Sequence, residues 1–501
     1  MTQRLRPDDM AFIATESAST PMHNATLEIF EPVGGFEYDR LLSLVADRIA
    51  FVPRYRQRVQ PVPGRLASPV WVDDAEFDLT YHVRRSALPR PGSMDQLRDL
   101  TARLMSRQLD RNRPLWEMYF IEGVDGDRFA ILSKSHQILV DGASTIDLGQ
   151  VILDIEPKPK GTPHVGWHPR PAPSQPSLVA RAVWDSVRDP RLALATLGDN
   201  AGSVVRAANA VGGRVSSLAG ALAGRRPVPR TPVNTRLSEQ RRLVTVKTSL
   251  DDYRRVRRFH GGTVNDVILA ALTGALRNWL MTRAEPVHGG RALRAMVPMG
   301  VIDSELEPTS LGSQVAGHLL NLPIGEPSPV VRLHQVSYAL KAHKETGRAV
   351  AAERLAGVAG FAPTTFHALG SRVAAAELRR GFDLVITNVP GPQFPLYAAG
   401  ALMSESYPVQ PLLPGHALSI GVTSYDGRVF YGLNGDRDAL PDLAVLGQCV
   451  TEALEELVDS ASSSRHRAPR GRTNAPPTAP PTGRSSARPT AGSRTGKPSG
   501  P

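Results

Sequence analysis

A histidine, a glutamine and an Asp-Gly pair lie within seven residues of one another, where they could support proton transfer. The stretch SHQILVDG places His136, Gln137, Asp141 and Gly142 directly after the apolar segment RFAILSK. A histidine, whose ordinary pKa is close to neutral pH, can remove a proton from the hydroxyl or thiol of an acceptor. An acid a few residues further on, followed by a glycine suited to a tight turn, can hold the loop and the imidazole in position. Taken alone, this pattern is weak evidence of an enzyme.

The segments before this loop predict the strands and the helix that position it. Residues 116–123 and 128–134 are rich in aromatic and aliphatic side chains and are separated by VDGD, which predicts strand, turn, strand. Ser93 is a suitable N-cap for a helix whose apolar face carries Leu97, Leu100 and Leu104. The loop is therefore expected at the end of a buried strand.

The clearest helix of the sequence is predicted over 263–280. Its apolar residues recur with a period of 3.6, and Thr263 and Asp266 have the spacing of a capping box. Helix and strand signals alternate both before and after a proline-rich break at 157–176. This mixture predicts an α/β fold with more than one domain.

Composition divides the chain of 501 residues into four parts. We predict a first domain that carries the loop, a proline-rich and basic helical connector, a second domain and a disordered tail, with bounds at 1–155, 156–231, 232–460 and 461–501. The tail is rich in Pro, Ser, Thr, Gly and Arg and has almost no large apolar residue, so it cannot bury enough surface to fold.

The net charge of +11 belongs to the connector and the tail. The tail carries eight basic residues and no acid, and residues 177–230 carry eight arginines against three aspartates. Those two segments have net charges of +8 and +5, which leaves −2 for the rest of the chain. No basic patch interleaved with aromatic residues accompanies them, so we expect no nucleic-acid partner.

Cysteine content and hydropathy bear on localisation. Cys449 is the single cysteine, which excludes an intramolecular disulfide and suits a reducing cytosol. The start, MTQRLRPDDMAF, has no apolar signal region, and no run of 18 apolar residues occurs. We expect a cytoplasmic protein whose membrane association, if any, is peripheral and on the inner face. Residues 177–222 are basic and amphipathic, and both a membrane-surface role and simple packing outside the domains stay open.

Several further motifs, in a fixed order, give the loop a specific context. Together the motifs resemble the wax ester synthase/acyl-CoA:diacylglycerol acyltransferase family, whose HHxxxDG motif is shared with chloramphenicol acetyltransferase-like enzymes and with peptide-synthetase condensation domains. The resemblance spans about residues 4–458 and rests, beside the loop, on Leu5 to Asp8, Pro21 to His23, Arg113 to Trp116, Asn265 to Val267, Thr387 to Pro392, Tyr407-Pro408, Ser424-Tyr425 and Pro441-Asp442.

The resemblance implies a fold and a reaction. The fold would comprise two chloramphenicol-acetyltransferase-like α/β domains, joined by a long crossover, with a tunnel at their interface. Acyl-CoA as co-substrate and diacylglycerol or a long-chain alcohol would meet in the tunnel, at a membrane or lipid-droplet surface. The second histidine of the motif would act as general base, and the acceptor oxygen would attack the thioester directly, without an acyl-enzyme, a metal or another cofactor.

The alignment by Asp141 and Gly142 places the first histidine of the motif at His136 and the second at Gln137. A glutamine amide donates or accepts hydrogen bonds but takes up no proton at useful pH. The family's base is therefore missing. Neighbouring residues of an extended segment point to opposite faces, so His136 is expected to face away from the substrate. Other histidines that could approach the tunnel are His23, His82, His318 and His416.

Eight further residues are predicted to support the motif or line the tunnel: Pro114, Leu115, Trp116, Asn265, Asp266, Asn388, Pro390 and Gly391. For Leu115 and Trp116 we favour packing beneath the motif strand. For Asn265 and Asp266 we favour helix capping and contact with the other domain. Residues 388–392 are first of all a turn.

The sequence leaves two functions open. The first is an acyl-CoA-dependent O-acyltransferase that makes triacylglycerol or wax ester, with activity reduced by Gln137. The second is a degenerate homologue that binds lipids or partners without catalysis. A peptide-synthetase condensation domain shares the loop, but it would not account for the motifs around Trp116, Asn265 and Asn388 together.

Overall fold

The computed structural model contains two six-stranded sheets, around which the helices pack. The structure describes residues 3–32, 36, 38–139, 148–158, 166–188, 231–300, 315–345 and 381–463. The first sheet has the order β11-β12-β1-β6-β5-β4, with bounds Tyr397–Ala398, Ala401–Val409, His23–Glu31, Arg128–His136, Trp116–Val124 and Val83–Ala87. The second has the order β7-β14-β13-β10-β8-β9, with bounds Arg241–Ser249, Arg428–Asp436, Leu418–Tyr425, Leu384–Pro390, Leu293–Gly300 and Val315–Leu322.

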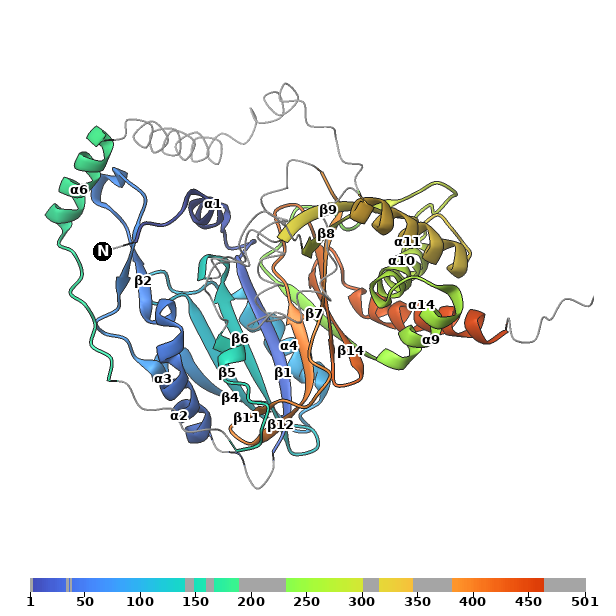
Figure 1. The fold of residues 1–501 in the computed structure, drawn as a ribbon, viewed down its shortest axis with the longest axis horizontal. Coiled ribbons are helices and arrows are strands. Elements are labelled where there is room, and N and C mark those ends of the chain that lie inside the picture. The colour runs from blue at the N-terminus through green and yellow to red at the C-terminus, as the bar shows by residue number, and fades with distance from the viewer. Residues whose placement is uncertain are drawn as a thin grey trace, which may run out of the picture. The chain divides into compact units, whose positions relative to one another are not determined.

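The first sheet is antiparallel except for the parallel pair β4 and β5, and β1 lies between β12 and β6 (Figure 1). Strands β5 and β6 form the hairpin predicted from the sequence. At its turn Gly126 and Asp127 have positive φ angles of 77° and 57°, the region that glycine and aspartate tolerate best. Both strands are almost continuously buried, which explains the lack of polar alternation in their sequences.

The helices near the first sheet have bounds Pro7–Thr15 (α1), Tyr38–Arg48 (α2), Leu79–His82 (α3), Met94–Ser106 (α4), Leu148–Val151 (α5) and Gln175–Arg188 (α6). Strands β2 (Gln57–Gln60) and β3 (Val70–Asp73) form a separate small hairpin. Ser93 caps α4 in a complete capping box with Gln96, which confirms the predicted helix start. Leu97 and Leu104 face the core as expected.

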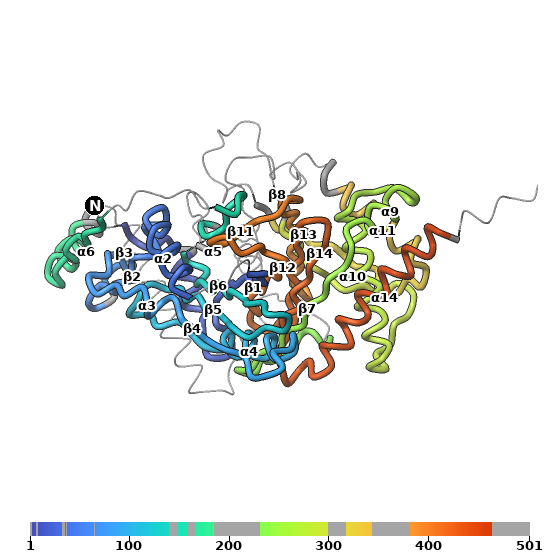
Figure 2. The backbone as a smooth tube through the Cα atoms, turned by 90° about the horizontal axis from the view of Figure 1, so that it is seen from below, coloured from blue at the N-terminus to red at the C-terminus, as the bar shows by residue number. Residues whose placement is uncertain are grey.

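Helices α9 (Leu250–His260), α10 (Val264–Thr282), α11 (Pro329–Glu345) and α14 (Leu443–Ser463) gather beside the second sheet (Figure 2). Their apolar side chains and those of β7, β8, β10, β13 and β14 form one core. Thr263 caps α10 and forms the predicted capping box with Asp266. Within the described residues, no helix is long and apolar enough to cross a membrane.

Strand β12 ties the two sheets together, because it pairs with β1 while it also packs on β13 and β14. Its Pro408 approaches the second sheet closely. A Cβ atom on Gly432 would lie only 1.9 Å from the Pro408 carbonyl oxygen, so this crossing requires glycine. The first sheet thus contains strands from the predicted range 232–460, and the four-part division by residue number stays a prediction.

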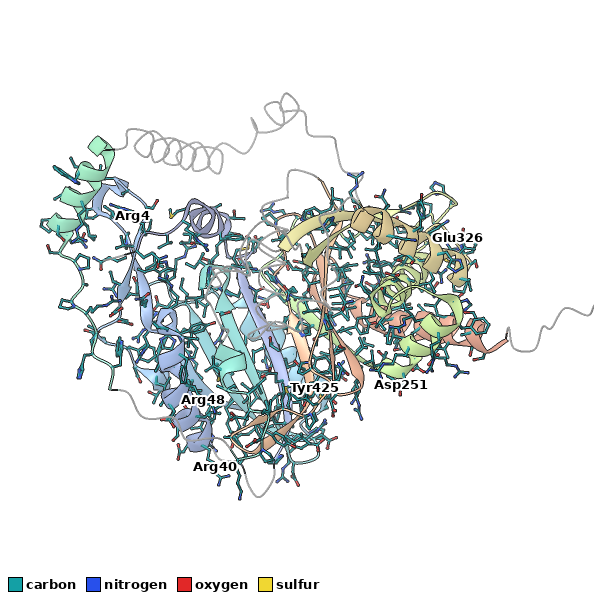
Figure 3. All side chains as sticks on the ribbon, viewed as in Figure 1. Arg4, Arg40, Arg48, Asp251, Glu326 and Tyr425 are labelled. Carbon is teal, nitrogen blue, oxygen red and sulfur yellow. The ribbon has the colours of Figure 1, made fainter. Side chains whose placement is uncertain are left out.

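The chain that returns from the motif loop is anchored to α2. Arg48, labelled in Figure 3, donates hydrogen bonds to the Val151 carbonyl and to Asp154 Oδ1, each at 2.8 Å. Asp154 also forms a backbone bridge with Tyr397 at the edge of the first sheet. These contacts anchor residues 151–154 to α2 and to the edge of the first sheet.

Candidate active site

Backbone hydrogen bonds hold the end of β6, where the predicted motif begins. The His136 N–H donates to the Leu115 carbonyl, and the Gln137 N–H donates to the Met22 carbonyl, each at 2.9 Å. Trp116 is buried, and its indole N–H donates to the Tyr55 carbonyl at 2.7 Å. The segment Pro114 to Trp116, itself buried, therefore positions the motif strand through its backbone, while the Trp116 ring packs in the core.

Both nitrogens of the His136 ring are engaged. The Ile138 N–H donates to Nδ1 at 3.2 Å, which assigns the ring proton to Nε2. Nε2 lies 3.7 Å from Oε2 of Glu16, and both side chains are 2% exposed. The ring thus faces a buried carboxylate, and its one lone pair is used by the backbone of the following turn.

Glu16 is the centre of a buried charged cluster that the sequence did not reveal. Its Oε1 lies 3.3 Å from Nε2 of His23, and Nε of Arg111 donates to its Oε2 at 3.0 Å. Burial opposes ionisation, but the two imidazoles outweigh it and hold the pKa of Glu16 well below its ordinary value. Glu16 is therefore a carboxylate at neutral pH.

His23 is neutral at the same pH. Burial, followed by the positive charge of Lys134, lowers the pKa of His23 from 6.5 to about 3, although Glu16 acts in the opposite direction. The ring is completely buried, and its centroid lies 5.8 Å from that of His136, its register partner across β1 and β6. The cluster therefore packs against the end of β6.

Lys134 is a second buried group that the sequence reading missed. Its Nζ donates to the carbonyls of Leu104 (3.0 Å) and Arg107 (2.5 Å) at the end of α4, and lies 3.8 Å from Glu117. Burial lowers the pKa of the amine from 10.5 to about 8. Lys134 therefore closes the last turn of a helix rather than serving the loop.

Gln137 contacts a different neighbour. Its Nε2 donates to Oδ1 of Asn24 at 3.1 Å, and both side chains are buried. Asn24 follows His23 in β1, so the two side chains lie on opposite faces of the sheet. The glutamine at the position of the family's base is thus separated from the Glu16 cluster by the sheet itself.

Met22, beside the end of β6, packs against apolar side chains of the second sheet. This residue, whose carbonyl accepts from Gln137, is fully buried. It packs in one cluster with Met296 of β8, Val385 of β10, and with Phe382, Leu413 and the partly buried Leu319. Met22, whose carbonyl binds the Gln137 backbone, therefore lies in an apolar contact between elements of both sheets.

The predicted residues of the second half form their own set of contacts. Nδ2 of Asn388 donates to Oδ1 of Asn265 at 2.7 Å, which joins the end of β10 to the start of α10. Asp266 accepts from the Thr263 N–H at 2.9 Å and from the Ser337 hydroxyl at 2.8 Å. The capping role favoured for Asp266 is what the contacts show.

Residues 390–391 form the turn that leaves β10. The Gly391 N–H donates to the Ser424 carbonyl at 2.9 Å, and a Cβ atom on Gly391 would lie 2.3 Å from that oxygen. Only glycine fits there. Pro390 precedes it as the last residue of β10 and is half-buried. Asp141 and Gly142 lie outside the described residues.

The other candidate histidines have separate surroundings. His82 stacks on Trp116 with centroids 4.7 Å apart, and its Nδ1 contacts the Trp116 carbonyl at 2.8 Å. His416 bonds to the carbonyls of Pro414 and Phe382. His318 lies on β9. His23 contacts Glu16 in the cluster behind His136.

Two hollows on the surface of the described residues lie beside elements of the first half of the chain. One of about 560 Å³ lies between β3 and the start of α6, and one of about 1010 Å³ lies at the β5–β6 turn. Residues 136–139 and 388–391 line neither. The interfacial tunnel stays a prediction. Within the described residues, no group of three or more His, Cys, Asp or Glu side chains could hold a metal ion.

Comparison with known proteins places these features in a family. The model of the wax ester synthase/diacylglycerol acyltransferase catalytic domain matches residues 5–268, and that of the WS/DGAT C-terminal domain matches residues 311–458. The probable diacylglycerol O-acyltransferase tgs3 of Mycobacterium tuberculosis is 44% identical over 261 residues, 51% of this chain and 96% of that protein. The probable diacylglycerol O-acyltransferase tgs2 of the same species is 33% identical over 463 residues, 90% of this chain and 98% of that protein.

Comparison with solved structures supports the same family and fold. The wax ester synthase/diacylglycerol acyltransferase from Marinobacter aquaeolei VT8 has a TM-score of 0.63 at 28% identity, and the match covers 92% of this chain and 100% of that one. The first condensation domain of the calcium-dependent antibiotic synthetase, at 14% identity and a TM-score of 0.52, covers 92% and 97% and shows the shared fold. The predicted two-domain α/β fold is confirmed. The chain belongs to the wax ester synthase/diacylglycerol acyltransferase family of acyltransferases.

Proposed function

We propose that the protein transfers an acyl group from acyl-CoA to the hydroxyl of diacylglycerol or a long-chain alcohol, at a rate limited by Gln137. The relatives named as diacylglycerol O-acyltransferases, one of which matches 90% of the chain at 33% identity, support the reaction class. The observation that carries the reduced rate is the buried amide of Gln137, bonded to Asn24 where the family's base is expected. Loss of a general base typically slows a reaction by about 10²–10⁴-fold.

His136 does not replace the missing base in this proposal. A base needs a free lone pair directed at the acceptor hydroxyl. Nδ1 of His136 already accepts from Ile138, and Nε2 carries the proton and faces Glu16. To act as a base, the ring would have to lose the hydrogen bond that its Nδ1 accepts from the Ile138 N–H in the turn that follows β6.

We place the reaction at a lipid surface, because the proposed acceptor is a lipid. Helix α6 offers a feature suited to such a surface, since its Val183 and Trp184 are more than half exposed while Leu178 anchors the helix in a small apolar cluster. Tryptophan side chains are enriched where protein meets the membrane interface. Sedimentation of the protein with phosphatidylglycerol vesicles, compared with the variant Trp184→Ser, tests this placement.

A non-catalytic lipid-binding homologue is the second candidate, favoured by the same Gln137–Asn24 bond, which fills the base position with a group that cannot titrate. The two are separated by an assay of ester formation from labelled palmitoyl-CoA and diacylglycerol. We expect slow but measurable wild-type turnover and a faster Gln137→His variant. Gln108→His, the same exchange at an exposed position, is the matched control and should leave the rate unchanged.

The assay has a clear negative outcome. If the purified wild type forms no ester above the background without protein, while Gln137→His does, the chain is the degenerate homologue. If neither forms ester, the acyltransferase proposal is wrong for these substrates.

A further inference from the structure

The hollow of about 560 Å³ lies between β3 of the β2–β3 hairpin and the chain that enters α6. Helix α6 lies beside this hairpin, because Leu178 packs with Val70 and Val72 in one small apolar cluster (Figure 1). The volume falls in the range of about 300–1,000 Å³ that is typical of small-molecule sites. The hollow is lined by the polar side chains of Gln3, Gln57, Asp73, Arg170, Ser177 and Arg181.

Two arginines determine the charge of this hollow. Arg170 donates to the carboxylate of Asp73 through Nε at 3.1 Å and through Nη2 at 3.3 Å, and its backbone N–H donates to Oδ2 at 3.0 Å. Among the described lining residues, Asp73 is the only carboxylate, and this contact offsets its charge. Arg181, which is exposed on α6, therefore gives the hollow a net positive charge.

The two amides of the wall are oriented by a third arginine. Arg54 stacks over the ring of Trp71 at 4.4 Å, and it donates to Oε1 of Gln57 at 3.0 Å and to Oε1 of Gln3 at 2.5 Å. The N–H side of each amide is thus turned away from Arg54, and Nε2 of Gln57 donates to Asp73 at 2.8 Å. Guanidinium and amide donors therefore dominate the wall, which suits an anion with acceptor oxygens.

Exposed apolar side chains adjoin the hollow on α6. Val183 and Trp184 are 52% and 61% exposed, and Trp184 follows Arg181 by three positions. Residues three apart on a helix are neighbours on its surface, so the tryptophan projects beside the arginine. The segment 177–230, which begins on α6, has a net charge of +5. Basic charge next to exposed tryptophan suits the interface of an anionic membrane, where lipid phosphates lie above the acyl chains.

We propose that this hollow binds the phosphate of an anionic phospholipid headgroup, with Arg181 and Arg170 as the donors. Arginine holds phosphate oxygens through paired N–H groups, and Nη1 of Arg170 lies outside the ion pair with Asp73. The headgroup enters the hollow while Val183 and Trp184 lie against the acyl chains. The inference rests on the lipid surface of the proposed function and names the group that the protein recognises there.

A soluble phosphate ester has the same charged group and would satisfy the same arginines. It would leave Val183 and Trp184 in water, whereas a membrane lipid accounts for both the donors of the hollow and the exposed apolar side chains beside it. We therefore assign the phosphate to a lipid, and the soluble source is one outcome of the experiment.

Sedimentation with vesicles measures the partition of the full-length protein, without acyl-CoA. The wild type should bind vesicles of phosphatidylcholine mixed equally with phosphatidylglycerol, and should bind phosphatidylcholine alone weakly. Arg181→Gln should lower the partition coefficient for the mixed vesicles by about tenfold or more, because hydrogen bonds from a charged donor are lost. Arg258→Gln, the same exchange at an exposed position of α9, is the matched control and should bind as the wild type.

A second variant separates a seated headgroup from diffuse attraction between opposite charges. Arg181→Lys keeps the charge but lacks the planar pair of donors, so it should bind the mixed vesicles severalfold more weakly than the wild type. Hydrogen exchange of the wild type gives a readout that needs no variant. Residues 71–73 and 170–181 should exchange more slowly on the mixed vesicles than in solution.

Wild-type binding by both Arg181 variants, or unchanged exchange over 170–181, overturns the inference. If glycerol 1-phosphate without lipid gives the same protection at the same concentration, the site serves a soluble ester and the lipid assignment is wrong. Ester formation is assayed separately, with substrates dispersed in detergent. Vesicle binding without ester formation therefore contradicts the proposed function alone, and ester formation without vesicle binding contradicts this inference alone.

Discussion

Replacing His23 by glutamine should remove part of the protein's sensitivity to acid. His23 has a pKa of about 3 in the folded protein against 6.5 ordinarily. Between these values the unfolded chain binds a proton that the folded chain does not, so the stabilisation is complete above pH 6.5 and is lost as the pH falls toward 3. Integrated from pH 7 to pH 5, the loss from this one fully buried residue is about 2 kcal/mol.

The pH window isolates His23 from its neighbour. The lowered pKa of Glu16 acts in the same direction, but only below the ordinary glutamate value of 4.5. Urea unfolding is followed by tryptophan fluorescence at pH 7 and pH 5, for the wild type, His23→Gln and the exposed control His168→Gln. The variant His23→Gln should lose about 2 kcal/mol less than the wild type between the two pH values, while His168→Gln should behave as the wild type. An equal loss in all three proteins would refute the reasoning.

Two further predictions concern the supports of the two sheets. Asp266→Ala should lower the free energy of unfolding by about 1–3 kcal/mol, because the Thr263 N–H and the Ser337 hydroxyl lose their acceptor; an unchanged urea midpoint would contradict the capping role. Lys134→Met keeps the length of the side chain but leaves the carbonyls at the end of α4 unpaired, which should also cost about 1–3 kcal/mol. A variant that unfolds at the wild-type urea concentration or above would show that Lys134 is not the group that closes α4.

Local patterns in the sequence predicted the elements that carry the site. Thr263 with Asp266 and Ser93 with Gln96 define helix starts through contacts only three residues apart, so their spacing alone is informative. The β5–β6 hairpin follows from two apolar runs around a turn that contains glycine. The family resemblance, carried by motif order, is confirmed by the family models.

The surroundings of the site could not be predicted in the same way, because they depend on long-range contacts. Arg111 meets Glu16 across 95 positions, and Asn24 meets Gln137 across 113. Neither contact leaves a periodic or spacing signal. His23 lay within a recognised motif, yet nothing in the letters showed that it would share a carboxylate with His136. Strand β12 joins β1 through a pairing that no local pattern encodes.

Strand geometry accounts for the different surroundings of two neighbouring residues of the motif. Alternation along β1 and β6 predicts that His136 and Gln137 have different neighbours, and they contact Glu16 and Asn24 respectively. The roles assigned to Gln137 and His136 stay predictions. Asp141, which lies outside the described residues, keeps its expected role as a residue that orients the loop.

The pH dependence of kcat/KM for Gln137→His beside the wild type tests the central claim, that position 137 is the base position and that this chain has no base there. We expect a rate that is nearly independent of pH between 6 and 9 for the wild type, since no amide titrates. The variant should show a rise as the introduced histidine loses its proton, with a pKa at or below the ordinary value of about 6.5, because the position is buried. At pH 8 it should exceed the wild type by about 10²–10⁴-fold, roughly 3–5 kcal/mol of transition-state stabilisation. A wild type that already shows a histidine titration, or a variant that is no faster, would show that position 137 is not the missing base position.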